Sequence, residues 1–336
     1  MSTLIEYTQI ELLTLSGPEY RRVSTAPPRP PTEDEIPIID LSSIDGDIED
    51  RKGIASKIRS AAENTGFFYV KNHGIAEELI QNALSQAQTF FNQPDEKKEL
   101  VSSKRSKLSD GWHGLGTTQV NKTETRDRKE TFSVRYNPRN DPTIPDPESL
   151  LKDSRFSYGG DELKWQGTSH LPGFRETTIE FYQRRLALAR KMVRIFALAL
   201  DMPENYFDEV TTHPGADGLY VHYPGTDEDR EDDKADVDVG IGSHTDIQCL
   251  TLLWQDMSGG LQVLSVSDEW LDAAPIAGTL VVNIGDFLQR LSNNRFKSTV
   301  VPSCVDEEHP ALYAPISCGK WHRNRLELSS GRTIST

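Results

Sequence analysis

The strongest constraint on the fold is a series of short strand-like runs in the last third of the chain. Turn-forming sequences such as Ser258-Gly259-Gly260 separate these runs. Several short strands at this spacing, with no long helical pattern between them, predict an antiparallel sandwich or barrel. The runs are rich in β-branched and aromatic residues and cover residues 248–254, 261–265, 270–274, 279–285 and 295–301.

Helical patterns precede this region and predict an α+β chain. Apolar residues recur at helical spacing over 51–64, 77–92 and 172–200, whereas 36–41 and 66–75 are short strand-like runs. We therefore expect a mainly β core that is flanked by helices, with an N-terminal region of alternating strands and helices. With 336 residues, the chain is long enough to bury a sizeable core.

The same patterns divide the chain into four parts. Residues 1–35 contain Pro27-Pro28-Arg29-Pro30-Pro31 and no clear periodicity, which predicts an extended arm. Residues 36–170 are expected to pack on the barrel, and residues 171–300 to form its core. Residues 301–336 are an atypical tail, because they lack the strand periodicity that closure of the barrel needs.

Charge and cysteine content exclude several classes of partner. The formal net charge of -15 would repel nucleic acid and anionic membranes, so we expect neither as a partner. Three cysteines are too few and too irregularly spaced for a disulfide framework or a zinc site, which favours a reducing compartment. No secretory signal and no apolar run of membrane-spanning length is found, so a cytoplasmic protein is expected. The oligomeric state cannot be deduced.

An imidazole and a carboxylate lie two residues apart in Gly240-Ile241-Gly242-Ser243-His244-Thr245-Asp246. Side chains two residues apart point to the same face of an extended segment. One imidazole and one carboxylate on one face make up two of the three ligands of the 2-His-1-carboxylate triad, which binds Fe(II) and leaves positions open. A bare His-x-Asp pair occurs often by chance, so its surroundings decide its meaning.

Those surroundings resemble one family closely. Three phrases follow the pair in order: Gly259-Gly260-Leu261-Gln262-Val263, Gly278 to Asp286, and Asn294 to Val300. Upstream, Gly66-Phe67-Phe68-Tyr69-Val70-Lys71-Asn72-His73-Gly74 belongs to the same pattern. The series resembles the Fe(II)/2-oxoglutarate dioxygenase superfamily, in the branch that includes isopenicillin N synthase and the soluble oxygenases of plants and fungi. The resemblance implies a double-stranded β-helix, or jelly roll.

The resemblance also implies a reaction. In this family Fe(II), 2-oxoglutarate and O2, with ascorbate as reductant, oxidise a C–H bond of a small-molecule substrate, by hydroxylation, desaturation or ring closure. His244 and Asp246 match two of the metal ligands, and Tyr223 matches a tyrosine that lies near the 2-oxoglutarate carboxylates. By the same resemblance the substrate belongs to secondary metabolism.

Other polar and aromatic residues have two interpretations each. Trp112, His113 and Phe132 lie in segments that line the substrate pocket in the family, although aromatic residues there can equally be packing residues. His73 lies in a turn without a carboxylate partner, which favours a structural hydrogen bond over a metal-binding role. His222 alternates to the opposite face from Tyr223 and is not expected to be a ligand.

The resemblance breaks at Val301. The family pattern has its second histidine directly after Phe-Lys-Ser-Thr-Val, and about ten residues later an Arg-x-Ser that binds the far carboxylate of 2-oxoglutarate. This chain has Val301 at the first place and no arginine near residue 310. Three explanations are open: an altered splicing or reading frame after residue 300, loss of iron chemistry that leaves a non-catalytic small-molecule-binding protein, or replacement of the ligand by His309 or His322.

Overall fold

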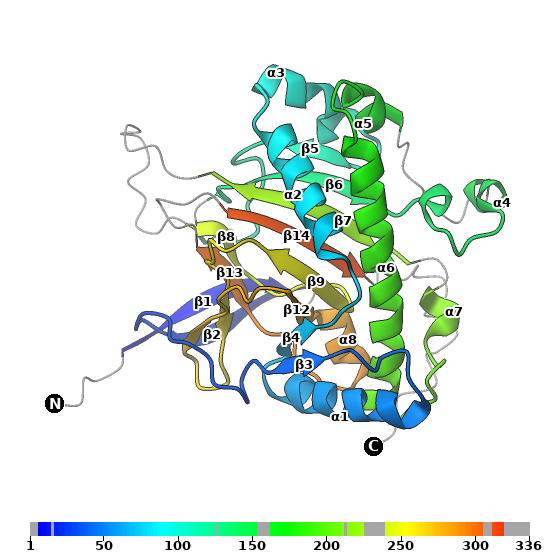
Figure 1. Ribbon diagram of the computed structural model, residues 1–336. Helices are drawn as coiled ribbons and strands as arrows, with labels where there is room; N and C mark the ends of the chain where they lie inside the picture. Colours follow the sequence, from blue (N-terminus) through cyan, green and yellow to red (C-terminus); the bar gives the residue numbers. More distant parts are fainter. Residues whose placement is uncertain are drawn as a thin grey trace.

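The computed structural model describes residues 6–14, 17–121, 123–124, 126–152, 162–211, 214–224, 239–304 and 311–318. Its largest element is an eight-stranded sheet to which strands from both halves of the chain contribute (Figure 1). All neighbouring strands are antiparallel except the first two, which are parallel. The strand order is β3 (Ile38–Asp40), β4 (Phe67–Lys71), β12 (Thr279–Ile284), β9 (Leu250–Gln255), β14 (Ala311–Cys318), β7 (Asp217–Tyr223), β6 (Glu130–Arg135) and β5 (Gly111–His113).

Two short antiparallel pairs form a second β layer over one face of this sheet. One pair joins β8 (Val239–His244) to β13 (Val301–Cys304), and the other joins β10 (Gln262–Leu264) to β11 (Trp270–Asp272). Inward-facing apolar residues of both layers bury one another, as in a β-sandwich. This inner cluster comprises Ile36, Phe67, Tyr69, Val221, Tyr223, Leu253, Leu261, Val263, Leu271, Ala273, Val281 and Val301.

Helices cover the opposite face of the large sheet. The longest helix, α6 (Phe174–Ala199), packs against α1 (Ile48–Asn64) and α2 (Glu77–Phe91). Helix α1 is capped by Asp47, whose side chain accepts hydrogen bonds from the backbone nitrogens of Glu49 and Asp50 in a capping box. The shorter helices are α3 (Asp95–Lys98), α4 (Pro147–Leu151), α5 (Glu162–Gly167), α7 (Asp208–Thr211) and α8 (Asp286–Leu291), with 3-10 turns η1 (Glu99–Val101), η2 (Ser103–Arg105) and η3 (Pro138–Asn140).

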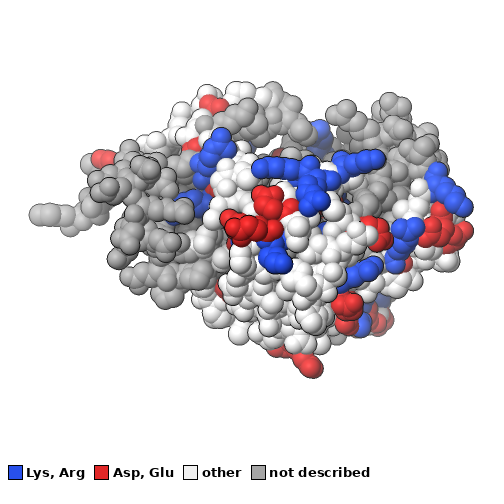
Figure 2. All heavy atoms as spheres, turned by 90° about the horizontal axis from the view of Figure 1, so that it is seen from above, with Lys and Arg blue, Asp and Glu red and all other residues white. Residues whose placement is uncertain are grey.

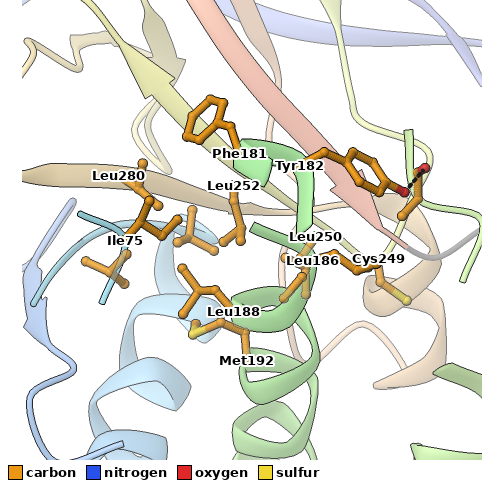
Figure 3. Close-up of a cluster of buried hydrophobic side chains, with 14 of the residues drawn as sticks. Ile75, Phe181, Tyr182, Leu186, Leu188, Met192, Cys249, Leu250, Leu252 and Leu280 are labelled. Atoms are coloured by element: carbon orange, nitrogen blue, oxygen red, sulfur yellow. Dashed lines mark hydrogen bonds between the residues drawn. The ribbon is translucent and has the colours of Figure 1, made fainter. Parts of the chain in front are cut away.

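The main hydrophobic core lies between α6 and the large sheet. Leu186, Leu188 and Met192 of α6 lie in the same cluster as Leu250 and Leu252 of β9 (Figure 3). Tyr182 is also fully buried there, and its hydroxyl donates a hydrogen bond of 2.9 Å to the carbonyl of Ala216. The close packing of α6 holds the helix-covered face of the sheet in place. The strands that face the second β layer are therefore held in fixed positions.

The N-terminal arm contains a β-hairpin that the sequence did not indicate. Strands β1 (Tyr7–Thr14) and β2 (Gly17–Ser24) pair over their whole length. An isolated hairpin is marginal in water, but here Leu12 and Val23 are buried against Leu264 of β10 and Val300, which directly precedes β13. The expectation of an extended arm over residues 1–35 is therefore corrected, because the burial that stabilises the hairpin comes from residues far along the chain.

The C-terminal tail also differs from its expectation. Residues 311–318 form β14, which lies between β9 and β7 in the large sheet, and residues 301–304 form β13. A strand that pairs on both edges is held by backbone hydrogen bonds, which do not depend on an alternating side-chain pattern. The absence of periodicity in the tail therefore did not exclude strands.

The surface carries charges of both signs. Lysine and arginine lie near aspartate and glutamate on the face drawn in Figure 2. Among the helices of the described residues, none combines the length and the apolar character that a crossing of a lipid bilayer requires.

Candidate active site

His244 is the last residue of β8, and its imidazole is held in one tautomer. The Nδ1 atom lies 2.8 Å from the carbonyl oxygen of Gly242. Because a carbonyl only accepts hydrogen bonds, Nδ1 carries a hydrogen, and Nε2 is the ring nitrogen left to face the cavity. Nε2 lies 3.6 Å from Oδ1 of Asp246. Metal-binding histidines are usually oriented in this way by a hydrogen bond from the other ring nitrogen.

The carboxylate of Asp246 is fixed by two strands of the large sheet. Thr251 Oγ1 in β9 donates a hydrogen bond of 2.5 Å to Oδ2, and Asn283 Nδ2 in β12 donates one of 2.8 Å to the same oxygen. Oδ1 is thereby directed toward His244. Burial alone would raise the pKa of Asp246, but His244, Asn283 and Thr251 together lower it to about 2. The group is therefore a carboxylate at neutral pH.

Both side chains open into a cavity of about 200 Å³ between the two β layers. The exposed surface of its wall is mostly apolar, with polar side chains among the apolar ones, as is usual for small-molecule sites. The apolar lining residues are Phe67, Leu219, Val221, Ile241, Leu253, Leu261, Val301 and Pro302, and the polar ones are Lys129, Thr131, Tyr223, His244, Asp246, Thr251 and Asn283.

Val301 lies opposite His244 in the β8–β13 ladder and lines the same cavity. Its side chain is buried and offers no donor atom to a metal. Accordingly, the described residues contain no group of three His, Cys, Asp or Glu side chains that could hold a metal ion. His309 and His322, the sequence-based candidates for a replacement, lie outside the described residues.

Asn121, Glu124 and Asp127, from a loop before β6, bind the backbone of β8. Glu124 accepts a hydrogen bond of 2.6 Å from the backbone nitrogen of Ser243, and Asn121 Nδ2 donates one of 3.3 Å to the carbonyl of Ser243. Asp127 accepts one of 3.3 Å from the nitrogen of Gly242. A Cβ atom at position 242 would lie 2.7 Å from Oε2 of Glu124, so the close approach requires glycine. Sequence reasoning missed this loop; the glycine before the His-x-Asp pair was the one local signal of it.

Lys129 is a second residue that the sequence did not single out. It lines the cavity, its side chain is 11% exposed, and its ammonium lies 3.4 Å from Oδ2 of the buried Asp127. Burial lowers the pKa of Lys129, and the negative charges of Asp127 and Asp246 offset only part of this effect. A lysine directly before a strand is common, so nothing local distinguished it.

Tyr223 lines the cavity. His222, its neighbour, points to the other side of the sheet, where Nδ1 lies 2.9 Å from Glu130. His73 has the structural role that was expected, because its Nδ1 accepts a hydrogen bond of 3.2 Å from the backbone nitrogen of Ile75.

Trp112, His113 and Phe132 lie outside the lining of the cavity. Trp112 and Phe132 belong to the main core, where Trp112 Nε1 donates to Glu130 and Phe132 packs against aromatic rings. His113 hydrogen-bonds with Ser103 and with the carbonyl of Ser109. The structure thus corrects the pocket interpretation. For Phe132 and its cross-strand partner Trp112 the reason is strand alternation: Thr131 faces the cavity, so its neighbour Phe132 faces the helices. His113 pairs with Thr131 but lies farther out, on the edge strand β5.

Comparisons with known proteins agree with this architecture. The family model described as "non-haem dioxygenase in morphine synthesis N-terminal" matches residues 36–154, and the model "2OG-Fe(II) oxygenase superfamily" matches residues 216–309. A 2-oxoglutarate-Fe(II) type oxidoreductase of Metarhizium rileyi, ppzC, is 37% identical, and the match covers 96% of this chain and 94% of that relative.

Solved structures are similar over most of the chain. A full-length Neurospora crassa protein in complex with alpha-KG and thymine matches with a TM-score of 0.68 at 27% identity, over 86% of this chain and 87% of that one. JOX2 in complex with 2OG, Fe and JA matches with a TM-score of 0.67 at 25% identity, over 88% and 78%. These proteins bind 2-oxoglutarate and small molecules, and their likeness confirms the predicted jelly roll. The chain belongs to the 2-oxoglutarate- and Fe(II)-dependent oxygenase superfamily, a family of oxidoreductases.

Proposed function

We propose that His244 and Asp246 bind Fe(II), and that the chain oxidises a small organic molecule in the adjoining cavity. One observation carries this proposal: Nε2 of His244 and Oδ1 of Asp246 lie 3.6 Å apart, both directed into the same cavity. An imidazole lone pair and a carboxylate oxygen are ligands that suit Fe(II). Two donors therefore fit the metal, and the third protein ligand is missing because Val301 has none to offer.

The neighbouring residues of this chain prepare the two donors. Gly242 fixes the imidazole tautomer, and Thr251 and Asn283 hold the carboxylate so that one oxygen is left for the metal. The aliphatic wall excludes water from the reacting groups. Bound Fe(II), with 2-oxoglutarate and O2 as co-substrates and ascorbate as reductant, supplies the oxidising power toward a C–H bond. Tyr223 lies in the cavity where its hydroxyl can contact the 2-oxoglutarate.

The substrate is a small molecule with a largely apolar surface, since apolar atoms make up most of the exposed cavity wall. We place the reaction in secondary metabolism, following the branch of the family that the sequence resembles. Hydroxylation, desaturation and ring closure are the outcomes open to such a site.

The absence of a metal-binding side chain at Val301 is the one observation that favours a second function, binding of small molecules without oxidation. Removing an outer-shell partner of a metal ligand already costs about 10–100-fold in affinity, and loss of a ligand costs more. A scaffold that holds iron weakly could bind small molecules without oxidising them. The two functions differ in turnover and in metal dependence.

The experiment is a succinate assay. Purified protein is incubated with Fe(II), ascorbate, 2-oxoglutarate and a panel of apolar small molecules, and succinate is measured beside a His244→Ala control. Succinate that forms with the unmutated chain and not with the control supports the oxygenase. Ligand binding that is independent of metal, with no succinate for any compound, supports the binding protein instead.

A further inference from the structure

Lys129 is the one cationic side chain among the described residues that line the cavity. It is nearly buried, at 11% side-chain exposure, although lysine is rarely buried without a partner. Asp127, 3.4 Å away, is its ion-pair partner within the described residues. A cation in an aliphatic wall is costly unless anions surround it, so its place there calls for an explanation.

Asp127 does not depend on Lys129 for its hydrogen bonds. Its carboxylate accepts from Thr118 Oγ1 at 2.8 Å and from the backbone nitrogens of Val120 and Gly242 at 3.3 Å each. An ammonium group has three N–H donors, and one contact with Asp127 occupies one of them at most. The ammonium therefore has donors left for a ligand that enters the cavity.

The place of Lys129 beside Tyr223 suggests what that ligand is. Strand β6 pairs with β7 through Glu130 and His222, so the residue before Glu130 lies next to Tyr223. On the other side, Tyr223 pairs with Ala311 of β14. Strand β14 has the sequence Ala-Leu-Tyr-Ala-Pro-Ile-Ser-Cys and supplies no cation. The positive charge beside Tyr223 is thus on Lys129, directly before β6, and not on β14.

We propose that Lys129 is an anion-binding residue that holds a carboxylate inside the cavity, beside the hydroxyl of Tyr223. A hydrogen bond between an ammonium and a carboxylate is among the strong ones in proteins. The carboxylate belongs either to the co-substrate, at the end away from its 2-oxo acid group, or to an organic-acid substrate. The inference rests on the proposed function because it takes this cavity as the site of both ligands.

The test measures ligand binding to the metal-free chain by ligand-observed NMR titration, so it does not depend on iron. One arm compares 2-oxoglutarate with 2-oxobutyrate, which lacks the second carboxylate. The other arm compares hexanoate with the neutral 1-hexanol. Each pair is titrated into the unmutated protein, Lys129→Met, Lys129→Arg and Lys71→Met. Lys71 is a matched control, since it also lies 3.5 Å from an aspartate, Asp40, but is exposed.

We expect the unmutated protein to prefer the compound with the additional negative charge in one arm, by roughly 10- to 100-fold. Lys129→Met abolishes that preference, Lys129→Arg keeps most of it, and Lys71→Met leaves it unchanged. A preference in the first arm identifies the co-substrate, and one in the second arm identifies an organic acid. No preference in either arm, or an equal preference in Lys129→Met with a native melting curve, overturns the inference. Failure of iron binding, measured separately, would leave this result standing.

Discussion

Val301 and His244 are paired residues on neighbouring strands, and both line one cavity. Directly opposed residues on an antiparallel pair have Cβ atoms only about 4.5–5.5 Å apart. A side chain at position 301 is therefore close enough to share a ligand with His244. In this chain the position carries an isopropyl group, which contributes packing and no electron pair.

The first prediction concerns Val301→His. The new imidazole would lie beside His244. Together with Asp246, the two imidazoles would then form a 2-His-1-carboxylate site, the ligand set that binds Fe(II) in this family of sites. We expect the affinity for Fe(II), or for Co(II) as a spectroscopic substitute, to rise at least about 10-fold. Anaerobic titration measures it.

The control for this change is Val300→His. Val300 packs with Leu12, Val23 and Leu264 under the hairpin and so points away from the cavity. It should gain no metal affinity. Equal affinities for Val301→His and the unmutated chain would show that position 301 does not share a ligand with His244.

The second prediction concerns the groups that hold Asp246. Asn283→Ala and Thr251→Val each remove a hydrogen bond to Oδ2, so the pKa of Asp246 should rise from about 2. Each change should lower the free energy of unfolding by about 1 kcal/mol, because a half-buried acceptor loses a donor. NMR titration of the carboxyl carbon and urea unfolding measure the two effects. An unchanged pKa in both variants would contradict the geometry described for this carboxylate.

The third prediction tests the loop that holds β8. Gly242→Ala would bring a Cβ atom to 2.7 Å from Glu124 and 2.9 Å from Asn121, so the loop must move away. Overpacking of this kind typically costs about 1–3 kcal/mol of stability. Gly53→Ala is the matched control, since Gly53 lies in α1 with nothing within 4 Å of an added Cβ, and it should stabilise the helix slightly. Thermal melting compares them, and equal melting temperatures would refute the close approach.

The fourth prediction concerns acid stability. Burial would raise the pKa of Asp141, but hydrogen bonds from Arg190, Thr143 and Tyr136 lower it below its ordinary value of 3.8. A carboxylate with a lowered pKa contributes its full stabilisation above about pH 3.8 and loses it as the pH falls through the folded-state value. Asp141→Asn should therefore be less stable than the unmutated protein at neutral pH by about 3 kcal/mol.

That difference should shrink in acid, when the native aspartate is protonated as well. Urea unfolding of both proteins at neutral pH and below pH 3.8 measures it. A difference that stays constant over this range would mean that Asp141 is not stabilised as a carboxylate.

Much of the site could be predicted because its signals are local. The period of two placed His244 and Asp246 on one face, and the same alternation separated Tyr223 from His222. The first four strand runs after residue 247 correspond to β9, β10, β11 and β12. The fifth prediction, a strand over 295–301, was wrong except at its last residue, where β13 begins. These features depend on residues within a few positions of each other, and tertiary packing did not override them.

What could not be predicted depends on contacts between distant segments. The hairpin β1–β2 is buried by Leu264 and Val300, and Asn121 and Glu124 reach β8 from more than a hundred residues earlier. No local pattern encodes such contacts. Phe132 was predicted to line the pocket because the strand that contains it passes along the pocket. The sequence did not show which residues of this strand face inward, and in the structure Thr131 does so.

The most direct test of the account is a metal titration of two proteins, the unmutated chain and His244→Ala. Anaerobic calorimetry with Fe(II) measures uptake by each. The account predicts binding of one ion per chain by the unmutated protein and loss of that binding in the variant, because two protein donors become one. Indistinguishable, negligible uptake by both proteins would contradict the claim that His244 and Asp246 form a metal site.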